Sequence, residues 1–223
     1  AEIKALFGIA ADQLPPSELI KTMLGADVEL LWFGGIGTYV KARHESHPDV
    51  GDRANEALRV NGAEVRAKVI GEGANLGVSQ QGRIEAALHG CRLNTDFIDN
   101  SAGVDCSDHE VNIKILLGEI EAGGEMTRKQ RDKLLVRMTD EVAALVLRDN
   151  YLQTQAITVT ATLGAHLLDR TARFMRVLEK SGNLDRAIEN LPDDETIAER
   201  IAKKIGLTRP ELAVLLSYAK ITL

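Results

Sequence analysis

The amino-acid sequence predicts an α/β fold in which part of a parallel sheet is followed by an all-helical region. Short apolar segments alternate with helical segments through the first half of the chain, and no strand pattern appears in the second half. Aromatic residues make up only 4% of a chain that is 44% hydrophobic. Alternating strands and helices are typical of parallel sheets with crossover connections, and this composition suits helix packing and short buried strands.

Three apolar segments are expected to form the strands, at residues 28–33, 67–70 and 92–98. Helical patterns precede and separate them, at residues 18–24, 53–58 and 80–88. The first of these helices follows two prolines and ends at Gly25, which suits the preference for proline in a first helical turn and for glycine after a last one. This order of elements favours parallel pairing of the strands.

Each predicted strand ends in a turn of small or amide residues. The turns are Gly34-Gly35-Ile36-Gly37, Gly71-Glu72-Gly73-Ala74-Asn75 and Asp99-Asn100-Ser101-Ala102-Gly103. Ligands of open parallel sheets bind outside the carboxyl ends of the strands, where glycines let the backbone approach a nucleotide. One such turn alone is more typical of an ordinary strand-to-helix connection. The three together favour a partial Rossmann-like parallel sheet with Gly34, Gly35 and Gly73 at its cofactor-binding edge.

The segment from Gly35 to Val40 matches only part of the glycine fingerprint of dinucleotide-binding proteins. Val40 occupies the position of the third glycine, and a polar segment containing Pro48 follows instead of a helix. We therefore do not expect this segment to bind a pyrophosphate. The fingerprint normally follows the first strand of such a domain, and residues 1–27 do not contain it.

The second half of the chain is predicted to consist of helices. Ser107-Asp108-His109-Glu110 has the pattern of a capping box, so a helix is expected to begin at Ser107 and to end at Gly123-Gly124. Further helices are expected after Thr127, across residues 155–180, after Pro192, and after a second capping box at Thr208-Arg209-Pro210-Glu211. Acidic residues predominate before Gly123-Gly124 and basic residues after it, so a domain boundary is expected there, between 1–124 and 125–223.

Charge and composition argue against several classes of protein. A net charge of −6 without clustered Lys and Arg argues against a nucleic-acid partner. Cys91 and Cys106 are too few for a disulfide framework and favour a reducing, cytoplasmic setting. No apolar stretch approaches the roughly 18 residues of a membrane helix, so no membrane partner is expected. The chain lacks an initiating Met and ends in an apolar helical run without a stop signal, so we expect an internal fragment.

Two groups of residues could carry other chemistry. His44, Glu45, His47 and Asp49 could be read as metal ligands, but a solvated charge cluster is the more typical interpretation, and no metal site is expected. Cys106 could be a reactive thiol, although a small buried residue is the more typical role of a free cysteine.

Four segments that together cover most of the chain carry a family resemblance. They are LLWFGGIGTYVKA at 30–42, AKVIGEGANLGVSQQGRIEAAL at 67–88, LNTDFIDNSAGVDCSDHEVNIKILL at 93–117 and LPDDETIAERIAKKIGLTRPELAVLLSYAKI at 191–221. In these segments the chain resembles the NAD-specific glutamate dehydrogenases of the large-subunit type. The resemblance implies NAD as the cofactor, L-glutamate and 2-oxoglutarate as substrate and product, and a full-length enzyme that is a homo-oligomer. It also implies that residues 1–124 are the C-terminal part of a dinucleotide-binding domain.

The resemblance extends to site residues of the small-subunit glutamate dehydrogenases. Those enzymes have an EGAN turn and a later N-A-G-G segment near the nicotinamide, and Asn75 and Asn100 fall on the two asparagines. They also place a serine seven residues further on, where it helps to hold the substrate's side-chain carboxylate, and that position is Ser107 here. Ser101 and Asp105 depart from the small-subunit pattern. A turn-forming role for the asparagines and a pure capping role for Ser107 are the alternatives.

The same resemblance places the catalytic Lys and Asp in an upstream substrate domain, and no matching motif occurs in this chain. We therefore expect no catalytic residue here and a fragment that is inactive alone. The alternative to an enzyme segment is a structural or assembly role for the helical half. A segment of another amino-acid dehydrogenase, of the leucine or phenylalanine type, is the alternative within the same class.

Overall fold

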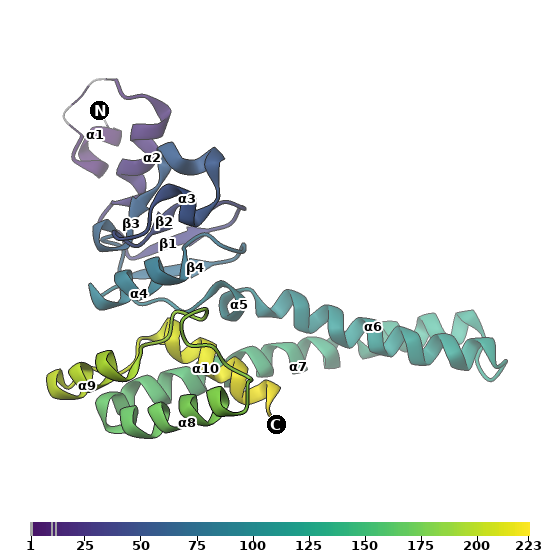
Figure 1. Ribbon diagram of the computed structural model, residues 1–223. Helices are drawn as coiled ribbons and strands as arrows, with labels where there is room; N and C mark the ends of the chain where they lie inside the picture. The colour runs from purple at the N-terminus through teal and green to yellow at the C-terminus, as the bar shows by residue number, and fades with distance from the viewer. Residues whose placement is uncertain (1, 10, 12) are drawn as a thin grey trace. The chain divides into compact units, whose positions relative to one another are not determined.

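The computed structural model describes residues 2–9, 11 and 13–223 (Figure 1). Packing divides the chain into two compact units. The first unit runs through Asp99 and resumes at Ile157–Leu223, and the second unit is Asn100–Ala156. The domain boundary predicted near residue 124 stays a prediction.

Two small parallel sheets lie in the first unit. Strand β1 (Leu30–Phe33) pairs with β4 (Val69–Glu72), with Trp32 opposite Gly71. Strand β2 (Val40–Lys41) pairs with β3 (Val60–Asn61). The strands predicted at 28–33 and 67–70 are thus confirmed with bounds shifted by two residues. Most of the chain is helical and the strands that it has are parallel, which is compatible with an α/β fold.

The strand predicted at residues 92–98 is wrong. Only Arg92 pairs with the sheet, as a single parallel bridge to Val69. The chain then turns back, because the N–H groups of Ile98 and Asp99 both bond to the carbonyl of Thr95, and Asp96–Asp99 form the short helix α5. Polar side chains at 94–96 and at 99 favour such a turn over a buried strand.

The remaining short elements of the first unit surround the two sheets. They are α1 (Glu2–Phe7), α2 (Pro16–Leu24), α3 (His47–Val50), α4 (Gln80–Leu88) and the 3₁₀ turns η1 (Arg53–Leu58) and η2 (Gly62–Glu64). The predicted helix at 80–88 and helical turn at 53–58 are confirmed. Ser79 caps the start of α4, because its hydroxyl accepts a hydrogen bond from the N–H of Gly82 at 3.0 Å.

Two glycines let α4 approach the small sheet. A Cβ on Gly62 would lie 2.5 Å from the carbonyl oxygen of Gly82, and a Cβ on Gly82 would lie 2.9 Å from the backbone of Lys41. A side chain at either position would push the helix outward. A buried apolar cluster lies beside this contact and includes Phe33, Val40, Ile70, Val78 and Ala86.

The rest of the first unit is helical. It contains η3 (Gly164–Leu167), α8 (Leu168–Lys180), α9 (Asp194–Lys203) and α10 (Arg209–Ile221). The second capping box is confirmed, because Glu211 accepts hydrogen bonds from the N–H and hydroxyl of Thr208. Helices α8, α9 and α10 bury an apolar cluster around Leu168, Met175, Leu178, Ile197 and Val214.

The predicted starting residue of the helix at 155–180 is wrong. Helix α7 (Arg128–Leu163) is continuous through residue 155, and the break comes at Gly164, whose φ is +52°. Glycine adopts this left-handed conformation at little cost, whereas nothing between residues 146 and 155 acts as a helix stop. Helix α8 follows this break (Figure 1).

The second unit is a helical hairpin of α6 (Ser101–Ala122) and residues 128–156 of α7, joined at Gly123-Gly124. The predicted start of α6 at Ser107 is wrong. The helix begins six residues earlier, after Asn100, and the Ser107 hydroxyl donates to the carbonyl of Val104 at 2.8 Å. A serine inside a helix commonly bonds back in this way, so the capping-box pattern at 107–110 is not used.

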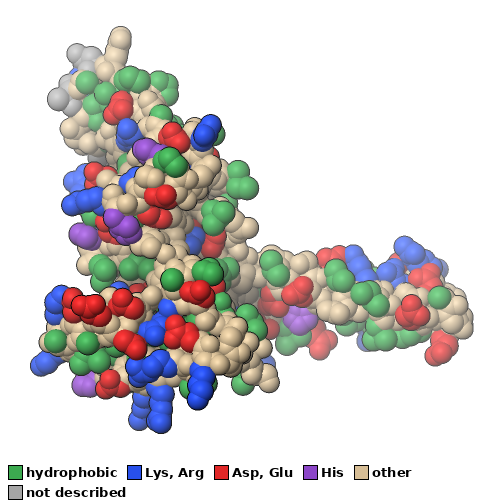
Figure 2. All heavy atoms as spheres, viewed as in Figure 1, with side chains coloured by type: hydrophobic (Ala, Val, Ile, Leu, Met, Phe, Trp, Pro, Cys, Tyr) green, Lys and Arg blue, Asp and Glu red, His purple; other side chains and the backbone are tan. Residues whose placement is uncertain are grey.

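The molecular surface carries charges of both signs. On the face drawn in Figure 2, Lys and Arg side chains are mixed with Asp and Glu. None of the helices in the described part of the chain is long and apolar enough to cross a membrane.

Candidate functional site

The turn that connects β4 to α4, residues 73–78, forms the candidate site and is called the β4–α4 turn. Gly73 and Asn75 are exposed in it. Leu76 has a φ of +61°, a left-handed conformation that costs a non-glycine residue energy. Such a conformation persists only where the surroundings fix it.

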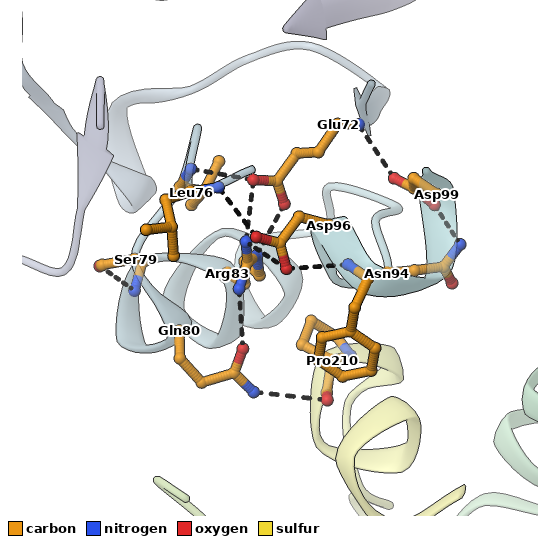
Figure 3. A network of polar contacts seen from close by, with 12 residues as sticks. Glu72, Leu76, Ser79, Gln80, Arg83, Asn94, Asp96, Asp99 and Pro210 are labelled. Carbon is orange, nitrogen blue, oxygen red and sulfur yellow. Dashed lines mark hydrogen bonds and ion pairs between the residues drawn. The ribbon is translucent and has the colours of Figure 1, made fainter. Parts of the chain in front are cut away.

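Four hydrogen bonds hold this turn and the strand end before it, and Figure 3 shows the bonds made by the carboxylates of Glu72, Asp96 and Asp99. They run from Ala74 N–H to the carbonyl of Phe33 (3.1 Å), from Leu76 N–H to Asp96 Oδ2 (2.8 Å), from Val78 N–H to Glu72 Oε1 (3.0 Å) and from Glu72 N–H to Asp99 Oδ2 (3.0 Å). The acceptors come from β1, β4 and α5. The turn is therefore fixed from three elements while Asn75 stays exposed to solvent.

Arg83 on α4 holds the carboxylates of Glu72 and Asp96 in place. Its guanidinium binds both carboxylate oxygens of Glu72, at 2.6 and 2.9 Å, and lies 3.2 Å from Asp96. Arg83 is 3% exposed and Glu72 is 1% exposed. Burial lowers the pKa of Arg83, but its hydrogen bonds to Glu72 and the charges of Glu72 and Asp96 outweigh burial, so the pKa lies above its ordinary value. A charged arginine thus orients both carboxylates.

Trp32, near the end of β1, lies beside the β4–α4 turn. This side chain is 57% exposed. A Cβ on Gly73 would lie 2.4 Å from the indole ring, and a Cβ on Gly71 would lie 2.6 Å from it. A Cβ on Gly34 would make ordinary contact with the same ring, at 3.6 Å. Glycines at 71 and 73 therefore let the indole lie flat beside the turn.

The structure brings four of the predicted cofactor-binding residues to one edge. Gly34 and Gly35 follow the carboxyl end of β1, and Gly73 and Asn75 follow the carboxyl end of its parallel partner β4. Asn100 directly follows Asp99 in sequence and is the first residue of the second unit. Ser107 is an exposed residue of α6 in the second unit. The cofactor role of Asn100 and the substrate role of Ser107 stay predictions.

Sequence reasoning missed the side chains that hold the site. Glu72 and Arg83 are 11 positions apart, Asp96 is further along the chain, and no local motif links them. Trp32 was read only as part of a buried strand, yet more than half of it is exposed. The one available signal was the presence of Asp, Glu and Arg in segments otherwise expected to be buried, since buried charges in proteins are paired.

The polar residues at 44–49 are used in hydrogen bonds within the protein. His44 bonds to Gln81 at 2.7 Å, Glu45 accepts from Ala42 N–H at 2.6 Å, and Asp49 accepts from Ser46.

Cys106 is exposed, so the buried role that is more typical of a free cysteine does not apply to it.

A different cluster, Asp105, His109 and Asp149 on α6 and α7, places its ligand-type atoms within 4.8 Å of one another. Asp105 Oδ1 lies 3.5 Å from His109 Nε2, so these two side chains contact each other directly.

The candidate site can bind and orient a ligand. Its exposed groups include glycine backbone, the amide side chain of Asn75 and the indole of Trp32, which suit a polar, planar ligand, together with the apolar side chains of Ile36 and Leu76. The carboxylates of the network point into the protein and hold the turn instead of reaching the exposed edge (Figure 3).

These features describe a mostly helical protein with small parallel sheets, compatible with an α/β fold, and with a glycine-containing turn at the carboxyl edge of one parallel strand pair. The family model of the catalytic domain of bacterial NAD-glutamate dehydrogenase matches residues 1–160. The chain belongs to this bacterial NAD-glutamate dehydrogenase family.

Three relatives named NAD-specific glutamate dehydrogenase are similar along the chain. The Pseudomonas aeruginosa protein is 60% identical over 222 residues, which is 100% of this chain. The Halomonas elongata protein is 54% identical over 98% of the chain, and the Mycobacterium tuberculosis protein is 50% identical over 100% of it. The chain spans only 14% of the length of each relative.

Proposed function

We propose that this chain is the part of an NAD-dependent glutamate dehydrogenase that seats the nicotinamide end of the cofactor. Gly34, Gly35 and Gly73 give the cofactor close access to the backbone, and the side chains of Asn75 and Asn100 hydrogen-bond the nicotinamide ribose or carboxamide. Ser107 contributes to holding the substrate carboxylate. The observation that carries the proposal is the β4–α4 turn, which is fixed from three elements and leaves Asn75 exposed at the carboxyl edge of a parallel strand pair.

The full-length enzyme, on this proposal, oxidises L-glutamate. A hydride passes from the α-carbon to NAD, and water then replaces the nitrogen, which gives 2-oxoglutarate and ammonia. This chain contributes binding and orientation, because an amide donates and accepts hydrogen bonds without adding charge. The proton-transferring Lys and Asp belong to another part of the protein, so the chain alone is inactive.

The test is to replace Asn75 by Ala in the full-length enzyme. Loss of one hydrogen bond to a neutral group corresponds to about 1 kcal/mol, so the KM for NAD should rise about fivefold to tenfold. The KM for glutamate should change much less. Asn183→Ala is the matched control, because Asn183 is also exposed and lies after α8, away from the strand ends. An unchanged KM for NAD in Asn75→Ala would contradict the proposal.

The second candidate function is an assembly role for the helical hairpin of α6 and α7. Exposed apolar side chains recur on one face of each helix: Val104, Val111 and Ile115 on α6, and Val136, Leu147 and Tyr151 on α7. Hydrophobic side chains are visible along the hairpin in Figure 2. By contrast, the apolar stripe of α10 is buried from Pro210 to Leu215. Unpaired apolar stripes favour docking of another part of the full-length protein or of a second copy.

Light scattering of this chain over a range of concentrations tests the assembly role. Self-association that Ile115→Lys abolishes would support it. A monomer at every concentration, together with no effect of Ile115→Lys on the assembly of the full-length enzyme, would exclude it.

A further inference from the structure

An open cavity of about 590 Å³ lies in the first unit, away from the β4–α4 turn. Its walls come from the end of α4, the segment that follows it, the end of α7 and the residues before α10. Leu93, Ala161 and Leu207 provide apolar surface, and Arg92 and Arg209 provide two positive charges. A hollow of this size exceeds what a simple ion needs and suits a small organic molecule.

Neither arginine takes part in an ion pair within the described part of the chain. Arg209 donates to two uncharged partners, the side-chain oxygen of Asn94 at 2.9 Å and the hydroxyl of Thr158 at 3.0 Å. The carboxylate of Asp99 acts on Arg209 from a distance, but its oxygens accept from Asn94 and from Glu72 N–H. Arg92 is exposed. The cavity wall therefore carries positive charge that none of the carboxylates the structure describes in the first unit neutralises by direct contact.

The two guanidinium groups also act on each other. Burial lowers the pKa of Arg209, and the positive charge of Arg92 lowers it further, against the opposing effect of Asp99. A bound anion would remove this repulsion.

We propose that this cavity binds a small organic anion. Its carboxylate or phosphate group lies between Arg92 and Arg209, and its apolar part packs against Leu93, Ala161 and Leu207. Arginine forks match both kinds of oxyanion, and the apolar wall selects ligands with a hydrocarbon portion over the bare ion. This site is separate from the cofactor edge and does not depend on the proposed dehydrogenase function.

The variant for the test is Arg92→Gln. Arg92 is exposed and its backbone, not its side chain, holds the sheet bridge, so this change should leave the fold intact. Arg209 is less suitable, because it holds Asn94, whose amide in turn donates to Asp99 beside the β4–α4 turn. Arg173→Gln is the matched control, since it removes the same charge from an exposed position of α8 outside the cavity.

Calorimetric titration of this chain with 4-methylpentanoate, its neutral amide and inorganic phosphate tests the proposal. We expect 4-methylpentanoate to bind with a Kd on the order of 1 mM, as for a ligand of about eight heavy atoms. Arg92→Gln should weaken binding at least about fivefold and Arg173→Gln should leave it unchanged. The amide and phosphate should bind more weakly than the acid. Equal binding of acid and amide, phosphate binding as tight as the acid, or no effect of Arg92→Gln would each overturn the proposal.

Discussion

Single residues hold the candidate site through buried charge. Arg83 makes a bidentate ion pair with Glu72, contacts Asp96, and donates to the side chain of Gln80 at 3.2 Å. Gln80 in turn donates to the carbonyl of Pro210 at 3.4 Å (Figure 3). Arg83 therefore supports the β4–α4 turn directly, and through Gln80 it also connects α4 to α10.

Replacement of Arg83 by Met should be strongly destabilising. The change removes the positive charge and leaves Glu72 buried without a counter-ion, so the free energy of unfolding should fall by about 3–5 kcal/mol. Urea denaturation followed by circular dichroism measures the effect. Arg83→Lys should lose less, because lysine keeps the charge but cannot make the bidentate contact. A loss below about 1 kcal/mol for Arg83→Met would show that the network does not hold this turn.

The two cysteines should differ in reactivity. Burial raises the pKa of Cys91 to about 11, against a smaller opposing effect of the hydrogen bond with the backbone of Ile70, and Cys106 is exposed. Alkylation needs the thiolate, and a raised pKa keeps Cys91 neutral until the pH approaches that value. Iodoacetamide at pH 8 should therefore label Cys106 alone in the folded chain and both cysteines in urea. Mass spectrometry reads the outcome, and rapid native labelling of Cys91 at pH 8 would contradict the buried placement.

At the scale of elements, α10 depends on one buried carboxylate. Glu211 is 1% exposed and accepts hydrogen bonds from Thr208 N–H (2.6 Å), the Thr208 hydroxyl (2.7 Å) and Arg200 of α9 (2.8 Å). This single side chain caps one helix and ties it to another. The apolar stripe of α10 then packs into the core of the first unit.

Glu211→Ala should destabilise the chain more than Thr208→Ala. The first change leaves the largely buried Arg200 without its partner and should cost about 3–5 kcal/mol, whereas loss of the cap hydroxyl alone should cost about 1 kcal/mol. Thermal and urea unfolding of both variants measure the difference. Equal losses would mean that the link between α9 and α10 contributes nothing beyond the cap.

At the scale of the whole molecule, the two units differ in how much core they have. Three buried apolar clusters lie in the first unit. In the hairpin of the second unit, the buried hydrophobic residues among those described are Leu117 and Val146. Since local stability follows buried apolar contacts, the hairpin should open more readily than α4 or α10.

Hydrogen exchange monitored by mass spectrometry tests this difference in the isolated chain. Amides in the middle of α6 should exchange at least about tenfold faster than those of α4 and α10, which pack in the first unit. In the full-length protein, protection of α6 should rise if another part covers its apolar stripe. Slow exchange of α6 in the isolated chain would contradict the thin core of the hairpin.

Local sequence signals determined much of the secondary structure. Proline before α2, Ser79 before α4, Gly123 after α6 and the Thr208–Glu211 box all act within one helical turn, so they can be read without knowledge of the fold. The glycine-rich strand ends and the family resemblance also came from the sequence. They placed Gly34, Gly35, Gly73 and Asn75 at one edge because parallel strands end at the same side of a sheet.

Only the tertiary structure decided the rest. A strand was expected at residues 92–98, but Asp96 and Asp99 accept hydrogen bonds from the backbone N–H groups of Leu76 and Glu72, and the short helix α5 forms there instead. Ser107 has a capping pattern, yet α6 begins at Ser101. The Glu72–Arg83–Asp96 network and the cavity between Arg92 and Arg209 likewise join residues far apart in sequence. Such contacts depend on which charged side chains the fold brings together, and the spacing of residues along the chain does not encode that.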